Sequence, residues 1–143
     1  MNVEQILKSK GKHDVETIRA DATVAEAAGV LSAKKIGALV VASEPGEIGG
    51  IVSERDVVRL VGRDGPSSLE LKVSEIMTEE VESCRPGESA MSVLGRMTEG
   101  RFRHMPVLEG DRMIGLVSIG DVVKARIEDI ERENAAMAEM LRG

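Results

Sequence analysis

The sequence GIVSERDVV at residues 50–58 returns as GLVSIGDVV at residues 115–123, and this pair decides how the chain is organised. Both stretches hold a glycine, two apolar residues, a serine, two variable residues, an aspartate and two valines. The serines, Ser53 and Ser118, are 65 residues apart, and so are the two aspartates. Upstream, the similarity continues with an offset of 66, because the first copy has one more loop residue. Spacing, residue class and expected element type recur together, which indicates two copies of one unit.

Each copy is expected to form a strand, a helix, two strands and a second helix. Residues 15–18 alternate like a strand, apolar residues from Val24 onward recur at helical spacing, and two apolar runs flank a Pro-Gly turn. The second copy repeats this order, with Val81 at the position of the first strand. A unit of about 50 residues buries too little surface to stand alone, so the copies should pack sheet to sheet about a pseudo-twofold axis.

The expected fold class is therefore α/β (α+β), with two related β-α-β-β-α repeats. The predicted organisation is a lead segment, a first repeat, a linker, a second repeat and a helical extension, at residues 1–14, 15–62, 63–72, 73–130 and 131–143 respectively.

Composition excludes several classes of function. The 143 residues are 42% hydrophobic and 31% charged, and no apolar run approaches the roughly 20 residues of a membrane span. The first residues do not resemble a secretion signal, so we expect a cytoplasmic protein that does not enter a membrane. A net charge of −6 and a single aromatic residue, Phe102, argue against nucleic acid as a partner. One cysteine and two histidines offer no metal-ligand spacing.

The Ser-x-x-Asp pattern before Val-Val has two interpretations. It is a capping box, in which the serine hydroxyl accepts from the amide three residues on and the acid accepts from the cap amide. It also stands where a strand runs into a helix, and the free amides and the dipole of a helix start favour an anion. An aspartate one turn into the helix suits the two adjacent hydroxyls of a ribose. A sugar at the aspartate and a phosphate near the serine together describe a nucleotide.

The doubled motif, the strand Gly-Ala-Leu-Val-Val at residues 37–41 and the segment Arg-His-Met-Pro-Val at residues 103–107 resemble a tandem pair of cystathionine-β-synthase (CBS) domains, also called a Bateman module. The resemblance covers roughly residues 15–126. It implies a non-catalytic regulatory fold that binds AMP, ADP, ATP or NAD in two clefts and signals to an unknown partner protein, with no required cofactor. No catalytic motif competes with this interpretation.

The resemblance also implies which residues hold the ligand. Asp121 and Asp56 would bind the ribose hydroxyls of their respective clefts, and Ser118 and Ser53 would bind ribose or phosphate. Each cleft would be closed by the strand edge of the other copy. The first cleft would thus comprise Ser118, Ile119, Gly120 and Asp121 from the second copy, with Ile36, Gly37 and Ala38 from the first. The second cleft would comprise Ser53 and Asp56 from the first copy, with Phe102 and His104 from the second. The cations near phosphate would be Arg103, Arg55 and Lys10.

The end of the chain carries a separate pattern. One helix is expected from about residue 118 to residue 141, and a seam of residues on it is spaced 4, 3, 4, 3 and 4 apart, as in a coiled coil: Val123, Ile127, Ile130, Asn134, Met137 and Leu141. The favoured interpretation is a homodimer formed partly through this helix. Alternatively, the stripe covers the chain's own sheet. The corresponding alternative function is a structural dimerisation or interaction protein whose clefts are empty.

Overall fold

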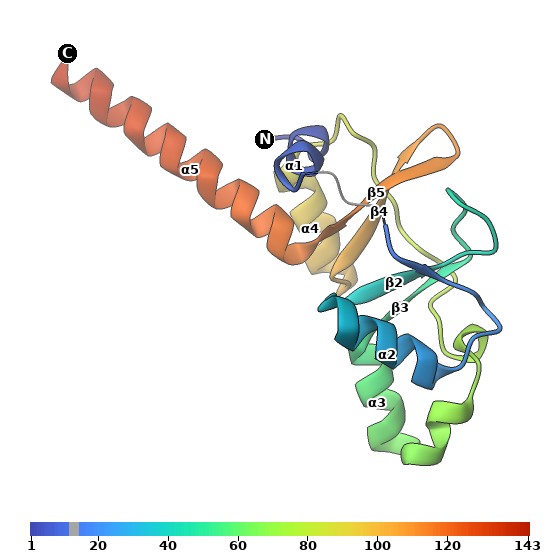
Figure 1. Ribbon diagram of the computed structural model, residues 1–143. Coiled ribbons are helices and arrows are strands. Elements are labelled where there is room, and N and C mark those ends of the chain that lie inside the picture. Colours follow the sequence, from blue (N-terminus) through green and yellow to red (C-terminus); the bar gives the residue numbers. More distant parts are fainter. Residues whose placement is uncertain (12–14) are drawn as a thin grey trace. The chain divides into compact units, whose positions relative to one another are not determined.

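The computed structural model describes residues 1–11 and 15–143 and contains two compact units. One unit is continuous in sequence, from Asp14 to Val81, and is called the continuous unit below. The other combines Met1–His13 with Glu82–Gly143 and is called the split unit. Each unit has helices and a small sheet (Figure 1), so the expected fold class of two mixed α/β repeats is confirmed.

The continuous unit is built on a three-stranded sheet. Strand β2 (Ala38–Val41) pairs in parallel with β1 (Thr17–Ile18) and antiparallel with β3 (Gly50–Ser53). All four residues of β2 are buried, as expected for a central strand. Helices α2 (Val24–Lys34) and α3 (Glu54–Asp64) are followed by two short 3-10 turns, η1 (Pro66–Glu70) and η2 (Val73–Glu75). The core joins Ala27 and Leu31 of α2 to the apolar side chains of the sheet.

The split unit repeats the plan with a hairpin. Strands β4 (His104–Glu109) and β5 (Arg112–Ser118) pair antiparallel, and helices α4 (Ala90–Gly100), α5 (Ile119–Arg142) and α1 (Val3–Ser9) complete the unit. Its core lies between these helices and the hairpin. The terminal half of α5 extends away from the rest of its own unit (Figure 1).

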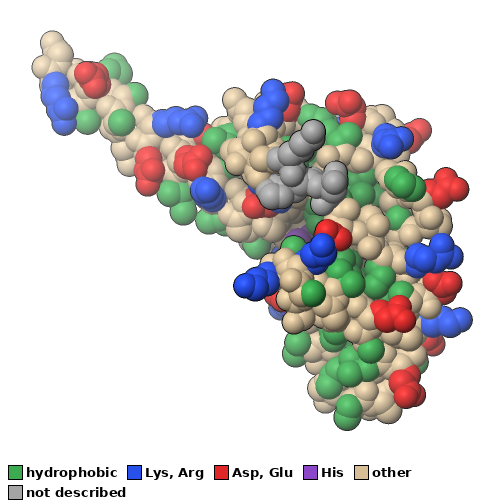
Figure 2. Space-filling model, in the orientation of Figure 1, with side chains coloured by type: hydrophobic (Ala, Val, Ile, Leu, Met, Phe, Trp, Pro, Cys, Tyr) green, Lys and Arg blue, Asp and Glu red, His purple; other side chains and the backbone are tan. Residues whose placement is uncertain are grey.

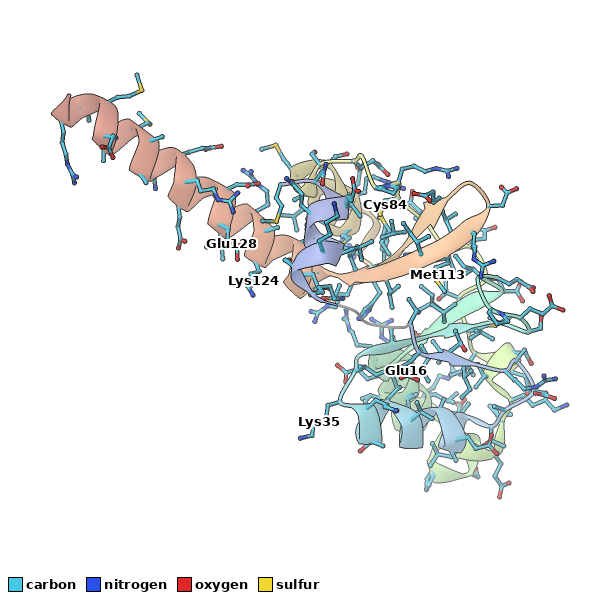
Figure 3. All side chains as sticks on the ribbon, turned by 45° about the horizontal axis from the view of Figure 1, so that its top comes forward. Glu16, Lys35, Cys84, Met113, Lys124 and Glu128 are labelled. Atoms are coloured by element: carbon cyan, nitrogen blue, oxygen red, sulfur yellow. The ribbon has the colours of Figure 1, made fainter. Side chains whose placement is uncertain are left out.

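Helices α2 and α4, which are equivalent in the two repeats, end in the same way. Helix α2 ends at Lys35 and α4 at Arg101, and both residues are left-handed, with φ of 55° and 57°. These residues are equivalent at the offset of 66 and turn the chain toward β2 and β4. Figure 3 shows the Lys35 side chain pointing away from the body of its unit.

The strand predicted around Val81 does not form in the second repeat. Only Cys84 makes a single parallel bridge, to Val107, where the first repeat has the two-residue strand β1. In the first repeat the Val40 amide donates to the Glu16 carbonyl, but the residue equivalent to Val40 is Pro106, which has no amide hydrogen. Because this ladder bond is lost, the segment stays outside regular structure.

The boundaries of the two units do not follow the order of the two repeats in the sequence. The Val3 amide donates to the Glu88 carbonyl (2.9 Å), and the Val73 amide donates to the Ala22 carbonyl (2.8 Å). Residues 3–7 (VEQIL) and 73–77 (VSEIM) are similar at an offset of 70. Each leading segment therefore packs on the body of the other repeat. The segment expected as a separate lead, at residues 1–14, supplies α1 to the split unit.

This exchange explains the glycine that opens each motif. A Cβ built on Gly115 would lie 2.7 Å from the Leu7 side chain, and one on Gly50 would lie 2.8 Å from Met77 Sδ. Leu7 and Met77 are equivalent in the two leading segments. At both positions a leading segment crosses the strand closely, which favours glycine, and at Gly50 the neighbours include the Thr78 backbone carbonyl as well as a side chain.

Candidate functional site

The first candidate site is the turn between β5 and α5. The Asp121 amide donates to Ser118 Oγ (3.1 Å), and the Ser118 amide donates to Asp121 Oδ2 (2.9 Å), so the predicted capping box is present. The strand delivers Ser118 in extended conformation, and the helix then places Asp121 one turn further on. Ser118 and Asp121 are both half-buried, whereas Gly120 between them is exposed.

A second element reaches this turn from far away in the sequence. Lys10, at the end of α1, donates from Nζ to Asp121 Oδ2 (2.7 Å) and to the Leu116 carbonyl (3.0 Å). Burial raises the pKa of Asp121, but the hydrogen bonds from Lys10 and from the Ser118 amide outweigh burial and leave that pKa below its ordinary value. The carboxylate is thus ionised at neutral pH and shared between the cap and the lysine.

The turn between β3 and α3 has the same geometry without the lysine. The Ser53 amide and hydroxyl both donate to Asp56 Oδ2, at 2.8 and 3.0 Å, and the Asp56 amide donates to Ser53 Oγ at 3.3 Å. No described residue forms an ion pair with Asp56, and Arg55 beside it is exposed. The two turns therefore differ in the charge that faces their aspartates.

Both aspartates keep one oxygen that receives no hydrogen bond from the described residues. Every hydrogen bond that a described residue gives to Asp56 or Asp121 goes to Oδ2, so Oδ1 accepts from none of them. The first three amides of a helix have no partner within the helix. In α5 the first of these donates to the Arg103 carbonyl (2.7 Å) and the third to the cap, which leaves the Gly120 amide as a donor. The turn therefore offers an anionic acceptor and a neutral donor side by side.

The first residue of β2 and the first residue of β4 each lie beside the capping serine of their own unit. Ala38 pairs with Ser53, and the Gly37 carbonyl accepts from the Glu54 amide (2.9 Å). In the split unit His104 pairs with Ser118 in the same way, next to the exposed Arg103.

The fourteen predicted site residues thus divide by unit. The continuous unit brings together Ile36, Gly37, Ala38, Ser53, Arg55 and Asp56, and the split unit brings together Lys10, Phe102, Arg103, His104, Ser118, Ile119, Gly120 and Asp121. Two of them also pack inward, since Ile36 and Phe102 are partly buried against the cores of their units. The predicted closure of each cleft by the other copy stays a prediction. The Leu116 carbonyl, which anchors Lys10, was missed because a backbone oxygen carries no sequence signal.

The seam of α5 is exposed. Val123, Ile127, Ile130, Met137 and Leu141 are 38, 51, 44, 63 and 87% exposed, and only Val122 and Ala125 of this helix are buried. Figure 2 shows hydrophobic side chains along the projecting helix, between charged ones. The alternative in which the stripe covers the chain's own sheet is therefore wrong.

Two other features bear on function. Among residues 1–11 and 15–143, no three His, Cys, Asp or Glu side chains are grouped as metal ligands. Within the same described ranges, no helix combines the length and apolar character that crossing a membrane requires.

Comparison with known proteins agrees with the repeat. The CBS domain family matches residues 3–63 and 73–128. The mitochondrial CBS domain-containing protein CBSX3 of Arabidopsis thaliana is 39% identical over 145 aligned residues, which cover 93% of this chain and 70% of that protein.

Solved structures show the same fold. The CBS-domain containing protein ATU1752 from Agrobacterium tumefaciens is 46% identical with a TM-score of 0.83, over 88% of this chain and 99% of that one. The CBS domain protein PAE2072 from Pyrobaculum aerophilum, solved in complex with AMP, is 22% identical with a TM-score of 0.73, over 85% and 89% of the two chains. With two repeats, two Ser-x-x-Asp turns and these relatives, the chain belongs to the CBS domain family.

Proposed function

We propose that this protein is a non-catalytic regulatory module that binds adenosine nucleotides, AMP, ADP, ATP or NAD(H), at its two Ser-x-x-Asp turns and signals to a partner protein. The observation that carries the proposal is the hydrogen bonding of the two aspartates. Each is fixed through Oδ2 by its own cap and keeps Oδ1 as an acceptor for ribose hydroxyls. The AMP complex of the PAE2072 protein supports an adenosine ligand for this fold. The cytoplasmic location expected from the sequence stays a prediction.

Thermal unfolding tests the proposal directly. A ligand that binds only the folded state stabilises it, by about 2.7 kcal/mol at a hundredfold excess over Kd. We expect AMP, ATP or NADH to raise the unfolding midpoint of the parent, and an Asp56→Ala, Asp121→Ala double variant to lose that shift. Asp64→Ala is the matched control, because Asp64 is an exposed residue at the far end of α3.

The outcomes separate the proposal from its alternatives. If no adenine nucleotide moves the midpoint of the parent, the clefts are empty and the chain is a structural interaction protein. If phosphate is released from ATP above the buffer blank and the release is lost in the double variant, the protein is an enzyme. Either result would overturn the non-catalytic binding function.

The exposed seam supports a homodimer formed partly through α5. In a coiled coil the residues flanking the seam face the other helix, and their charges set its direction. If two copies of α5 run parallel, Arg126 of each helix faces Glu131 of the partner subunit, and the Asn134 amides face each other. If they run antiparallel with the same seam in contact, the two Glu131 side chains face each other and Asn134 meets an isoleucine. The charges therefore favour a parallel pair.

Light scattering tests this surface. We expect Ile130→Asp to lower the mass toward that of a monomer, because it places a charge in the apolar seam. Arg132→Gln is the matched control, because it also makes the helix one charge more negative, two residues away and on the side of the helix opposite the seam. If Ile130→Asp keeps the mass of a dimeric parent, or if the parent itself is monomeric, the seam does not join two copies.

A further inference from the structure

The ion pair between Lys10 and Asp121 engages one oxygen of the carboxylate that the proposed function needs. Lys10 Nζ lies 2.7 Å from Asp121 Oδ2, and the two side chains are only 30 and 24% exposed. The lysine is also anchored by the Leu116 carbonyl, 3.0 Å away. A ligand that donates hydrogen bonds to Asp121 must therefore share this carboxylate with an ammonium or displace it.

At the other turn, no lysine of the part of the chain that the structure describes bonds to the aspartate. At the offset of 70 that relates the leading segments, the equivalent of Lys10 is Glu80, an exposed acid. No described residue forms an ion pair with Asp56, whose bonds come from its own cap. Among the described residues, the lysine thus contacts the aspartate at only one of the two turns, although both turns form the same cap.

We propose that Lys10 is a built-in competitor at Asp121, and that a ligand phosphate draws its ammonium away so that this site selects nucleotides over nucleosides. The inference rests on the proposed function and names the specificity of one of its two sites. A ribose offers only neutral hydroxyls, so an unphosphorylated adenosine weakens the charge-assisted bond of Lys10 and supplies nothing in return. A nucleotide supplies a phosphate, a second anion for the same ammonium.

Reach and placement allow this exchange. Lysine carries its charge on a flexible stem of four carbons with three rotatable donors, so the ammonium can change partners while its backbone stays in place. The Lys10 amide remains tied to the Ile6 carbonyl at the end of α1 (3.1 Å). The Gly120 amide and the positive end of the α5 dipole favour an anion at this same turn.

Calorimetric titration with AMP and with adenosine tests the exchange. The parent for this comparison carries Asp56→Asn, so that only the Asp121 site reports. We expect that parent to bind AMP much more tightly than adenosine. Lys10→Met should tighten adenosine binding and reduce the ratio of the two dissociation constants tenfold or more. Lys8→Met is the matched control, since Lys8 lies on the same helix, 75% exposed, and pairs only with Glu4 among described residues; it should leave both constants within twofold.

The outcomes distinguish the competitor from the site itself. If AMP binds the parent but Lys10→Met leaves adenosine binding unchanged or weaker, Lys10 does not compete and the inference is overturned. If neither ligand binds the Asp56→Asn parent, the Asp121 site holds no nucleotide and the inference is overturned. Binding of AMP by the unsubstituted protein would then still support the proposed function, at the Asp56 turn. Lys10→Gln is measured in parallel because its amide keeps a donor for Leu116. A ratio that changes in Lys10→Met and stays at the parent value in Lys10→Gln would show that the hydrogen bond to Leu116 matters and the charge does not, and would also overturn the inference.

Discussion

Replacing Gly50 by alanine tests whether the exchanged leading segments dictate the glycine of each motif. A Cβ on Gly50 would lie 2.8 Å from Met77 Sδ and 2.8 Å from the Thr78 carbonyl oxygen. That carbonyl accepts from the Ile51 amide (3.0 Å), and the Thr78 amide donates to the Ile51 carbonyl (2.9 Å). The backbone cannot retreat without straining both bonds. Overpacking of this kind costs about 1–3 kcal/mol, and restricting the unfolded chain returns only about 0.4–1 kcal/mol.

The second copy provides the matched control. The three atoms nearest to a Cβ on Gly115 are the two methyl carbons and Cγ of Leu7, at 2.7 to 3.4 Å, and a flexible side chain can move aside. We therefore expect Gly115→Ala to change the free energy of unfolding by less than about 1 kcal/mol, and Gly50→Ala to lower it by at least about 1 kcal/mol more. Urea unfolding followed by circular dichroism measures both. Equal losses, or a Gly50→Ala variant as stable as the parent, would refute the steric argument.

The remaining predictions concern acid stability, thiol reactivity and helix direction. Burial raises the pKa of Asp121, but the hydrogen bonds from Lys10 and from the Ser118 amide outweigh burial and hold that pKa below the ordinary 3.8. The ionised carboxylate therefore stabilises the fold above pH 3.8. This contribution is lost as the pH falls through the lower pKa of the folded state. The stability gap between parent and Asp121→Asn in urea should therefore shrink from pH 6 to pH 3, and a constant gap would contradict the ion pair. Burial raises the pKa of the Cys84 thiol to about 11, so a disulfide reagent at pH 8 should label it only after unfolding; rapid labelling of the native protein would show that this core opens readily. Met137→Cys should form a disulfide-linked dimer under mild oxidation if α5 pairs in parallel, because the antiparallel pair separates the two sulfurs by about 15 Å along the axis; a dimer without the cross-link would exclude the parallel form.

The sequence predicted the local features of the fold well. The capping boxes at Ser53 and Ser118 formed as expected because hydroxyl, amide and acid lie within three residues of each other. The strand at Val81 did not form because the residue that would donate to it from the neighbouring strand is Pro106, which has no amide hydrogen. The exchanged leading segments were missed because only a weak similarity, at a second offset, connects Val3 with Val73.

In the candidate site, too, the features fixed by nearby residues were predicted and those that join distant residues were not. Its aspartates were identified from the repeat, and Lys10 was named as a cation near phosphate. Its bond to Asp121 joins residues 111 positions apart, and no local pattern encodes such a contact. The α5 seam was in contrast visible as a periodic pattern on one helix, on which Lys124 and Glu128 lie one turn apart (Figure 3).

The exchange of leading segments also sets an order of events during synthesis. The continuous unit ends at Val81, so all its contacts are available once that part of the chain has left the ribosome. Helix α1 is made before the continuous unit but packs on residues after Val81, and the Lys10 side chain finds its partner only when Asp121 has been made. The apolar face of α1, with Val3 and Ile6, therefore stays uncovered until the last third of the chain appears. A nascent chain stalled before the second repeat would expose this helix to chaperones while its first folded unit was already complete.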